Sequence, residues 1–120
     1  MQKFIYLFTA IILISCQQKK PNNKFSDPTL RLIYTWQDQR ATKALLPYLK
    51  NDTAVYRAEA AMAFASVQDT NAISQLAELL NHKEENVRYS AAFALGQVKH
   101  LAALPYLRNA YNTESSSIVK

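Results

Sequence analysis

Few of the side chains that do chemistry in proteins occur here at spacings that would bring them together. Cys16 is the only cysteine, so no intramolecular disulfide and no cysteine-based zinc site can form within the chain. The two histidines, His82 and His100, are eighteen residues apart near expected helix boundaries, which is not the spacing of a metal pair. Glu84 and Glu85 make one turn acidic, but nothing marks them as a general acid and base. We therefore predict no catalytic site, no metal and no cofactor in these residues.

Cys16 follows a segment that is typical of protein export. Lys3 forms a short basic region, and residues 4–14 form an apolar run that only Thr9 interrupts before Ser15. A helix of these residues would be roughly 16 Å long, against about 30 Å for the hydrocarbon layer of a membrane. The run therefore favours a signal peptide at residues 1–15 over a permanent transmembrane helix.

The signal peptide ends in a pattern with a specific meaning. Residues 13–16, Leu-Ile-Ser-Cys, resemble the lipobox of bacterial lipoproteins. The resemblance implies that Cys16 becomes the lipidated first residue, held at a membrane by two or more acyl chains. An ordinary signal peptide with an incidental cysteine is the alternative. Residues 16–26 are polar and lysine-rich, as expected of a flexible tether. The implied location is the cell envelope facing the periplasm, and Gln17 favours the outer membrane if a sorting rule from other bacteria applies.

The formal net charge of +5 comes from the leader and the tether. Four basic residues precede Phe25 without any acidic residue beside them, namely Lys3, Lys19, Lys20 and Lys24. Removing them from the fourteen basic residues leaves ten against nine acidic ones. A domain that binds nucleic acid concentrates positive charge on one face. We therefore predict an unidentified protein as the partner, membrane contact through the lipid anchor alone, and no nucleic acid.

The rest of the chain contains an internal repeat. Residues 56–67 align with residues 87–98 at an offset of 31, and five of the twelve positions are identical. Leu-Pro-Tyr-Leu at residues 46–49 recurs at residues 104–107. Such a period is typical of helical repeat arrays. A composition with 49% apolar residues and a single glycine also favours helix over turn-rich β structure.

One copy of the repeat carries a recognisable pattern. Val-Arg-x-x-Ala-Ala-x-Ala-Leu-Gly-x-Val, at residues 87–98, resembles HEAT repeats of the short bacterial kind also named after phycobilisome lyases. The resemblance covers residues 41–120 and implies an all-α fold, an α-solenoid of about two and a half HEAT-type hairpins. We expect one such domain at residues 27–120. Its predicted helices lie near residues 28–37, 41–50, 54–67, 70–80, 85–98 and 101–110.

The ends and breaks of these helices can also be predicted. Asp27, Asp52 and Asp69 are suited to cap the helices that follow them. Pro47 and Pro105 should kink the first helix of a hairpin, because each removes a backbone donor. The helix at 101–110 has no second helix to complete its hairpin. Because repeats are stabilised by stacking and need a polar cap at each end, we expect the domain to be truncated and the natural chain to continue.

A second resemblance leaves two functions open. The lead helix and the Leu-Leu-Pro-Tyr-Leu segment at residues 45–49 are similar to those of Bacteroidetes-like lipoproteins, some of which join HEAT repeats to a cyclophilin-type prolyl isomerase domain. The preferred hypothesis is a lipid-anchored scaffold that binds a partner protein on its concave face. The alternative is the repeat region of a peptidyl-prolyl cis-trans isomerase whose catalytic domain lies beyond residue 120.

The resemblance also indicates where a partner would bind. In HEAT arrays the second helix of each hairpin lines the concave face, so it implies contact positions that step by four residues along residues 54–67 and 85–98. We predict that Met62, Tyr89, Phe93 and Gln97 bind the partner, the first three as an exposed apolar ridge, because aromatic residues and Met are enriched in interfaces. The alternative is that these side chains pack as ordinary core.

Other repeat positions are predicted to be structural. Ala61, Ala92 and Gly96 are small enough to let neighbouring helices approach closely. The resemblance implies that Arg57 and Arg88 each pair with an acidic residue near the turn between the helices. A partner contact is the alternative role for the arginines. The candidate acidic residues are Asp52, Glu84 and Glu85.

Overall fold

The computed structural model describes residues 23–120, which form helices and turns and no strand. The α-helices are α2 (Pro28–Asp38), α3 (Thr42–Leu45), α4 (Ala54–Val67), α5 (Ile73–Leu79), α6 (Glu85–Val98) and α7 (Leu104–Thr113). Short 3-10 helices are η1 (Lys24–Ser26), η2 (Leu46–Lys50), η3 (Thr70–Ala72) and η4 (Leu101–Ala103). The predicted all-α class is confirmed. The predicted signal peptide, Cys16 and residues 17–22 of the predicted tether lie outside the described residues.

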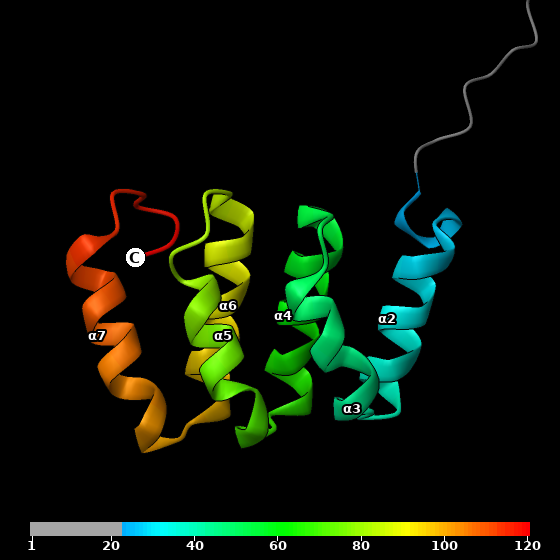
Figure 1. The fold of residues 1–120 in the computed structure, drawn as a ribbon, viewed down its shortest axis with the longest axis horizontal. Helices are drawn as coiled ribbons and strands as arrows, with labels where there is room; N and C mark the ends of the chain where they lie inside the picture. The colour runs from blue at the N-terminus through cyan, green and yellow to red at the C-terminus, as the bar shows by residue number, and fades with distance from the viewer. Residues whose placement is uncertain (1–22) are drawn as a thin grey trace, which may run out of the picture.

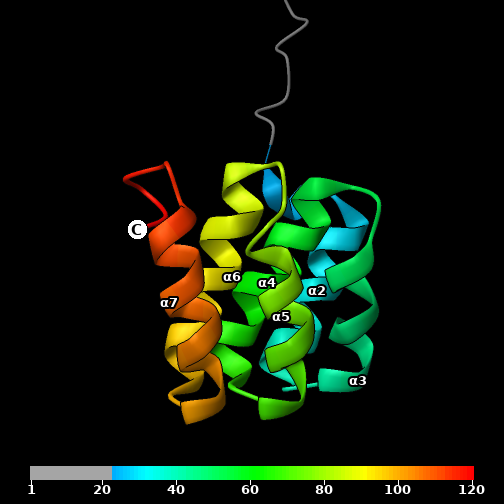
Figure 2. The same ribbon diagram turned by 60° about the vertical axis from the view of Figure 1, so that its left-hand side comes forward.

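The helices stack side by side in two layers. One layer contains α2, α4 and α6, and the other contains α3 with η2, α5 and α7 (Figures 1 and 2). The chain alternates between the layers, so each hairpin adds one helix to each layer. The most extensive helix contact is between α4 and α6, which are neighbours in the same layer. The architecture is a helical solenoid built from the hairpins α3–α4 and α5–α6, with α7 following.

Small residues allow α4 and α6 to pack closely. Ala60, Ala61 and Ala63 of α4 and Ala91 and Ala94 of α6 are fully buried. Larger apolar side chains fill the space between the layers, and those that are also fully buried are Ile33, Leu45, Leu49, Phe64, Leu76, Val87 and Leu95. Truncating one such side chain to alanine typically costs about 2 to 5 kcal/mol. The core therefore runs along the stack as a seam.

Two of the three predicted helix caps are confirmed. Asp27 accepts hydrogen bonds from two backbone N–H groups in the first turn of α2, at 2.8 and 3.1 Å, and Pro28 takes the first helical position. Asp69 accepts one from the start of η3 at 2.9 Å. The prediction for Asp52 is wrong, because the N-cap of α4 is Thr53, and its side chain makes no capping hydrogen bond.

The first helix of each hairpin is irregular, and only one proline causes a break. α3 ends after four residues and the chain continues as the 3-10 helix η2, with Pro47 at its start. Pro105 instead lies in the first turn of α7. The N–H that it lacks has no intrahelical partner at that position, so Pro105 begins a helix and the predicted kink is absent.

The two long inner helices end in the same way. Gln68 after α4 and Lys99 after α6 are equivalent at the offset of 31, and both adopt left-handed backbone conformations, with φ of 56° and 53°. Arg40 after α2 has a similar φ of 52°. Its side-chain Nη2 donates a hydrogen bond to the carbonyl oxygen of Val67 at 2.7 Å. This contact caps the end of α4 and fastens α2 to it.

Residues 24–26, which the sequence assigns to the tether, form the turn η1 and contact the solenoid. The ring of Phe25 lies 5.7 Å from that of Tyr34, measured between centroids. Lys24 forms a salt bridge with Glu59 of α4, and the Tyr34 hydroxyl donates a hydrogen bond to the same carboxylate at 3.1 Å. The packed part of the chain therefore begins before Asp27.

Candidate functional site

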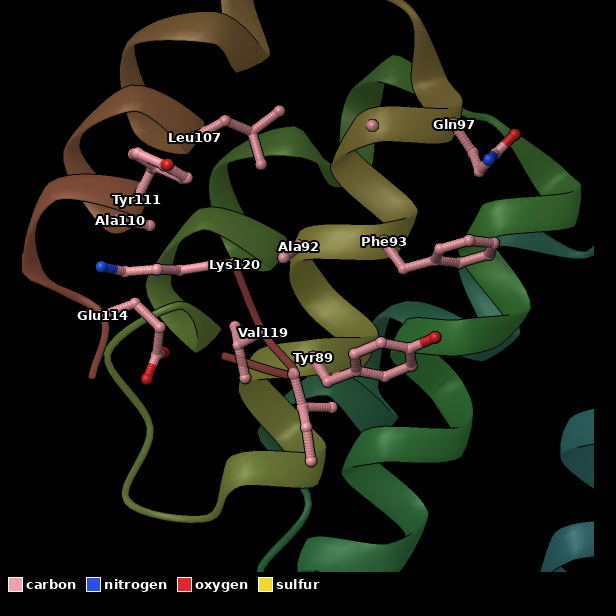
Figure 3. A pocket seen from close by; sticks show the side chains of 12 residues that line it. Tyr89, Ala92, Phe93, Gln97, Leu107, Ala110, Tyr111, Glu114, Val119 and Lys120 are labelled. Atoms are coloured by element: carbon pink, nitrogen blue, oxygen red, sulfur yellow. The ribbon is translucent and has the colours of Figure 1, made fainter. Parts of the chain in front are cut away.

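Two aromatic side chains are exposed on α6. Tyr89 is 39% exposed and Phe93 is 43% exposed. Their rings are stacked, with centroids 6.2 Å apart and an angle of 14° between the ring planes. The two residues are four apart and so lie on one side of the helix. Figure 3 shows both rings extending from that side, together with Gln97. We call Tyr89 and Phe93 the aromatic pair.

The other two predicted contact residues are less accessible. Met62 on α4 is half-buried and packs against the core, and Gln97 on α6 is also half-buried. Packing limits Met62 because α4 is covered on both sides, by α2 and by α6. Of the expected apolar ridge, only the aromatic pair is exposed.

A hollow of about 530 Å³ lies beside the aromatic pair, between α6 and α7. We call it the α6–α7 groove, and Figure 3 shows the side chains that line it. From α6 these are Tyr89, Ala92, Phe93, Gly96 and Gln97, and from α7 they are Leu107, Ala110 and Tyr111. The segment after α7 adds Glu114, Ile118, Val119 and Lys120. Sequence reasoning missed the α7 wall. The recurrence of Leu49 as Leu107 was the signal that could have identified it.

Arg88 holds three segments together beside the groove. Its Nε and Nη2 donate hydrogen bonds to the two carboxylate oxygens of Glu114, at 2.8 and 3.1 Å. Its Nη1 donates to the carbonyl oxygens of His82 and Lys83, at 2.9 and 3.0 Å. The hydrogen bonds from Arg88, with one from the backbone N–H of Ser116, lower the pKa of Glu114 to about 2. This paired arrangement is the strong form of an arginine–carboxylate contact.

The repeat arginines share a structural role that differs from the expected one. Arg57 donates from Nε and Nη2 to the carbonyl oxygen of Asn51, at 2.9 and 2.6 Å. Arg88 likewise donates to a backbone carbonyl oxygen, that of His82 in the turn before α6. Its acidic partner is Glu114, directly after α7. Neither is bonded to a turn residue that the sequence nominated, Asp52, Glu84 or Glu85. A guanidinium group has five N–H donors in one plane, so it can bond to the backbone carbonyl oxygens of a turn.

The small residues of the two inner helices have different surroundings. Ala61 on α4 is fully buried, whereas Ala92 on α6 is half-buried and Gly96 is exposed. A Cβ atom added at Gly96 would meet no heavy atom within 4 Å. The close approach predicted for these residues occurs at Ala61. At Ala92 and Gly96 the described residues leave the surface of α6 open to the groove.

Comparison with known proteins identifies this architecture. A family model for HEAT repeats matches residues 35–120, which include both hairpins and α7. The chain belongs to the HEAT-repeat family. No curated protein and no solved structure gives a match. HEAT repeats generally mediate protein–protein interaction.

Both histidines make hydrogen bonds within turns. His82 Nδ1 accepts a hydrogen bond from the backbone N–H of Glu84 at 3.1 Å, and His100 Nδ1 accepts one from Ala102 at 3.1 Å. Within residues 23–120 no three His, Cys, Asp or Glu side chains are grouped closely enough to hold a metal ion. No helix in this part of the chain is long and apolar enough to cross a membrane.

Proposed function

We propose that this HEAT-repeat chain is an interaction scaffold that binds a partner protein on the face formed by α4 and α6, the concave face of a HEAT array. The aromatic pair carries the proposal. Two stacked rings that remain about 40% exposed lose water when a partner covers them, and aromatic side chains are typical interface anchors. Because the pair is already stacked, a partner would not have to order it.

The neighbours of the aromatic pair suit a protein partner. Gln97 lies one turn beyond Phe93 and offers an amide for hydrogen bonds at the rim. Met62 occupies on α4 the place that Phe93 takes on α6, and its flexible thioether can adapt to a partner surface. Ten basic and nine acidic residues from Phe25 onward leave the domain nearly neutral, which supports a protein partner over nucleic acid.

We also propose that Cys16 carries a lipid anchor that holds the scaffold at a membrane of the cell envelope, facing the periplasm. The lipobox-like residues 13–16 support this. The described chain enters the solenoid at η1, beside α2, whereas the aromatic pair lies on α6 further along the stack (Figure 1). Attachment through residues before η1 would therefore leave the aromatic pair accessible to a partner.

The binding face is tested by replacing both aromatic side chains. We expect Tyr89→Ala with Phe93→Ala to lose the proteins that the wild-type chain captures from a cell-envelope extract, while helicity measured by circular dichroism stays unchanged. The matched control is Leu32→Ala with Val55→Ala, since those apolar side chains are 47% and 55% exposed on α2 and α4. Capture retained by the aromatic variant, or lost equally by the control, contradicts the proposal. Loss of helicity would assign the pair to the core.

The anchor is tested separately by Cys16→Ser. We expect the wild-type chain to incorporate a labelled fatty acid and to sediment with membranes, and the variant to do neither, because a hydroxyl at this position gives the lipid transferase no thiol. Membrane attachment that persists in the variant without labelled acyl chains refutes the lipid anchor. That result would leave the partner-binding proposal intact.

A further inference from the structure

The turn that precedes α6 is built like the turn that precedes α4, with one substitution. At the repeat offset of 31, His82 occupies in the second repeat the place of Asn51 in the first. Asn51 Oδ1 accepts a hydrogen bond from the backbone N–H of Thr53 at 2.9 Å. His82 Nδ1 accepts the equivalent bond from the backbone N–H of Glu84 at 3.1 Å. A ring nitrogen therefore replaces an amide oxygen as the acceptor.

These hydrogen bonds hold the residues that begin the two inner helices. Thr53 and Glu84 are the N-caps of α4 and α6, and their backbone angles are nearly the same, φ −82° and ψ 114° against φ −80° and ψ 124°. Neither N-cap side chain bonds to its own helix. The carbonyl oxygen of Glu84 accepts hydrogen bonds from the N–H groups of Val87 and Arg88, at 3.1 and 3.2 Å. The bond to His82 therefore fixes the residue on which the first turn of α6 is built.

The same turn also supports the aromatic pair. Arg88 Nη1 donates hydrogen bonds to the carbonyl oxygens of His82 and Lys83, while the other guanidinium nitrogens bond to Glu114. Tyr89 directly follows Arg88 in the chain. The position of Tyr89 therefore depends on a turn whose geometry His82 maintains.

The asparagine and the histidine differ in how they respond to acid. A neutral imidazole that accepts at Nδ1 carries its proton on Nε2, whereas a protonated imidazole has N–H groups on both nitrogens and cannot accept a hydrogen bond. The amide of Asn51 does not titrate. The bond at the start of α6 therefore forms only while His82 is neutral, and the one at the start of α4 does not depend on pH.

The groups around His82 favour its neutral form. Burial lowers the pKa of His82 from its ordinary value of 6.5, and the guanidinium of Arg57 on α4 lowers it further. Lys83 acts in the same direction, and the Glu84 carboxylate acts in the opposite one. The folded chain thus binds this proton less readily than the unfolded chain. The contribution of neutral His82 to stability is full above about pH 6.5 and is lost as the pH falls below it.

We propose that His82 is a pH-sensitive switch for partner binding, in which protonation of the ring releases the N-cap of α6 and weakens capture on the aromatic pair. The inference rests on the proposed function, because the partner binds that pair. Without its cap the first turn of α6 frays, and Arg88 loses the fixed carbonyl acceptors of the turn. A partner would then have to order Tyr89 on binding. The start of α4 stays in place, since Asn51 holds it.

The switch is observed at two backbone amides of the full chain. An NMR titration from about pH 7.5 to about pH 4.5 follows the His82 ring and the amide protons of Glu84 and Thr53. We expect the Glu84 amide resonance to move upfield with the midpoint of the His82 ring, because it loses its acceptor, while the Thr53 resonance stays in place. The pKa of Glu114 is about 2, so the carboxylate that holds Arg88 stays ionised over this range.

Exchanging the two turn residues tests the origin of the response. His82→Asn should abolish the shift of the Glu84 amide, since asparagine accepts the same bond and does not titrate. Asn51→His should create an acid-dependent shift at Thr53. His100→Asn is the matched control. It removes a titrating acceptor from the turn after α6, and the response of Glu84 should remain.

Regulation is tested by partner capture at two pH values. The wild-type chain and His82→Asn should capture equal amounts from a cell-envelope extract at about pH 7.5. At about pH 5 the wild type should capture at least roughly threefold less than the variant, which corresponds to the loss of about one hydrogen bond. Comparing the two chains at the same pH removes any effect of titrating the partner itself.

The outcomes separate this inference from the proposed function. A Glu84 amide that does not follow the His82 ring overturns the switch. So does a His82→Asn variant that captures no more than the wild type at about pH 5, and if Tyr89→Ala with Phe93→Ala still loses the partner, the proposed function stands. Capture that the aromatic variant retains refutes the proposed function and, with it, regulation of that site, even where the amides respond as expected.

Discussion

At the scale of single residues, Arg88 and Glu114 form a salt bridge in which two N–H groups of the guanidinium donate to the two carboxylate oxygens. Its two side chains are only 18% and 7% exposed, so water screens the pair weakly. The contact joins the start of α6 to the end of α7 and so fixes one end of the α6–α7 groove. Stability of this end of the stack should therefore depend on the charge of Glu114.

We predict that Glu114→Gln makes the stability of the chain less sensitive to acid. The pKa of Glu114 is lowered from 4.5 to about 2, so the ionised carboxylate stabilises the fold above pH 4.5. That contribution is lost as the pH falls from about 4.5 to about 2. The free energy of unfolding, measured with urea at several pH values, should fall less steeply in this window for the variant. Asp27 and Asp69 also have lowered pKa values. The free energy of unfolding of the variant should therefore still fall with pH, but less than that of the wild type.

Removing the other partner provides the control for this prediction. Arg88→Met should lessen the acid sensitivity in the same pH window, and the double variant should add little to either single one, because both changes delete one interaction. A Glu114→Gln variant that keeps the wild-type dependence on pH would show that the bond to Arg88 does not stabilise the fold.

At the scale of helices, the sequence predicted the inner layer well. The expected helices at 54–67 and 85–98 coincide with α4 and α6. Their alanine-rich repeats combine high helix propensity with the spacing of buried positions, so local preference and packing agree. The outer layer was predicted less well, because η2, η3 and η4 replace parts of the expected α-helices. Short 3-10 turns at helix ends leave little mark on the pattern of apolar residues.

The candidate site was only partly predictable, for a different reason. Tyr89 and Phe93 could be placed on one side of a helix from their spacing alone. The pairing of Arg88 with Glu114 spans 26 residues and depends on how α7 docks against α6, which no local pattern records. The exposure of Met62 was overestimated, because burial on α4 depends on having neighbours on both sides. The neighbours of a helix in the stack therefore decide which of its side chains are exposed, even where the repeat positions are equivalent.

At the scale of the whole molecule, equivalent positions should respond differently to the same substitution. We predict that Ala61→Leu lowers the free energy of unfolding by about 1 to 3 kcal/mol, because the larger side chain overpacks the closed contact between α4 and α6. Ala92→Leu, its repeat equivalent, should change the free energy of unfolding by less than about 0.5 kcal/mol, since Ala92 faces the open groove. Urea denaturation followed by circular dichroism measures both.

This comparison examines the stacked arrangement directly. The two alanines have the same place in the repeat, the same helix propensity and the same change in volume on substitution, so only their neighbours along the stack distinguish them. In a linear array each repeat is stabilised by its nearest neighbours, and an inner helix covered on one side tolerates what a helix covered on both sides does not. If Ala61→Leu and Ala92→Leu destabilise the chain equally, α6 is covered in solution as fully as α4 is. The α6–α7 groove would then be closed in solution.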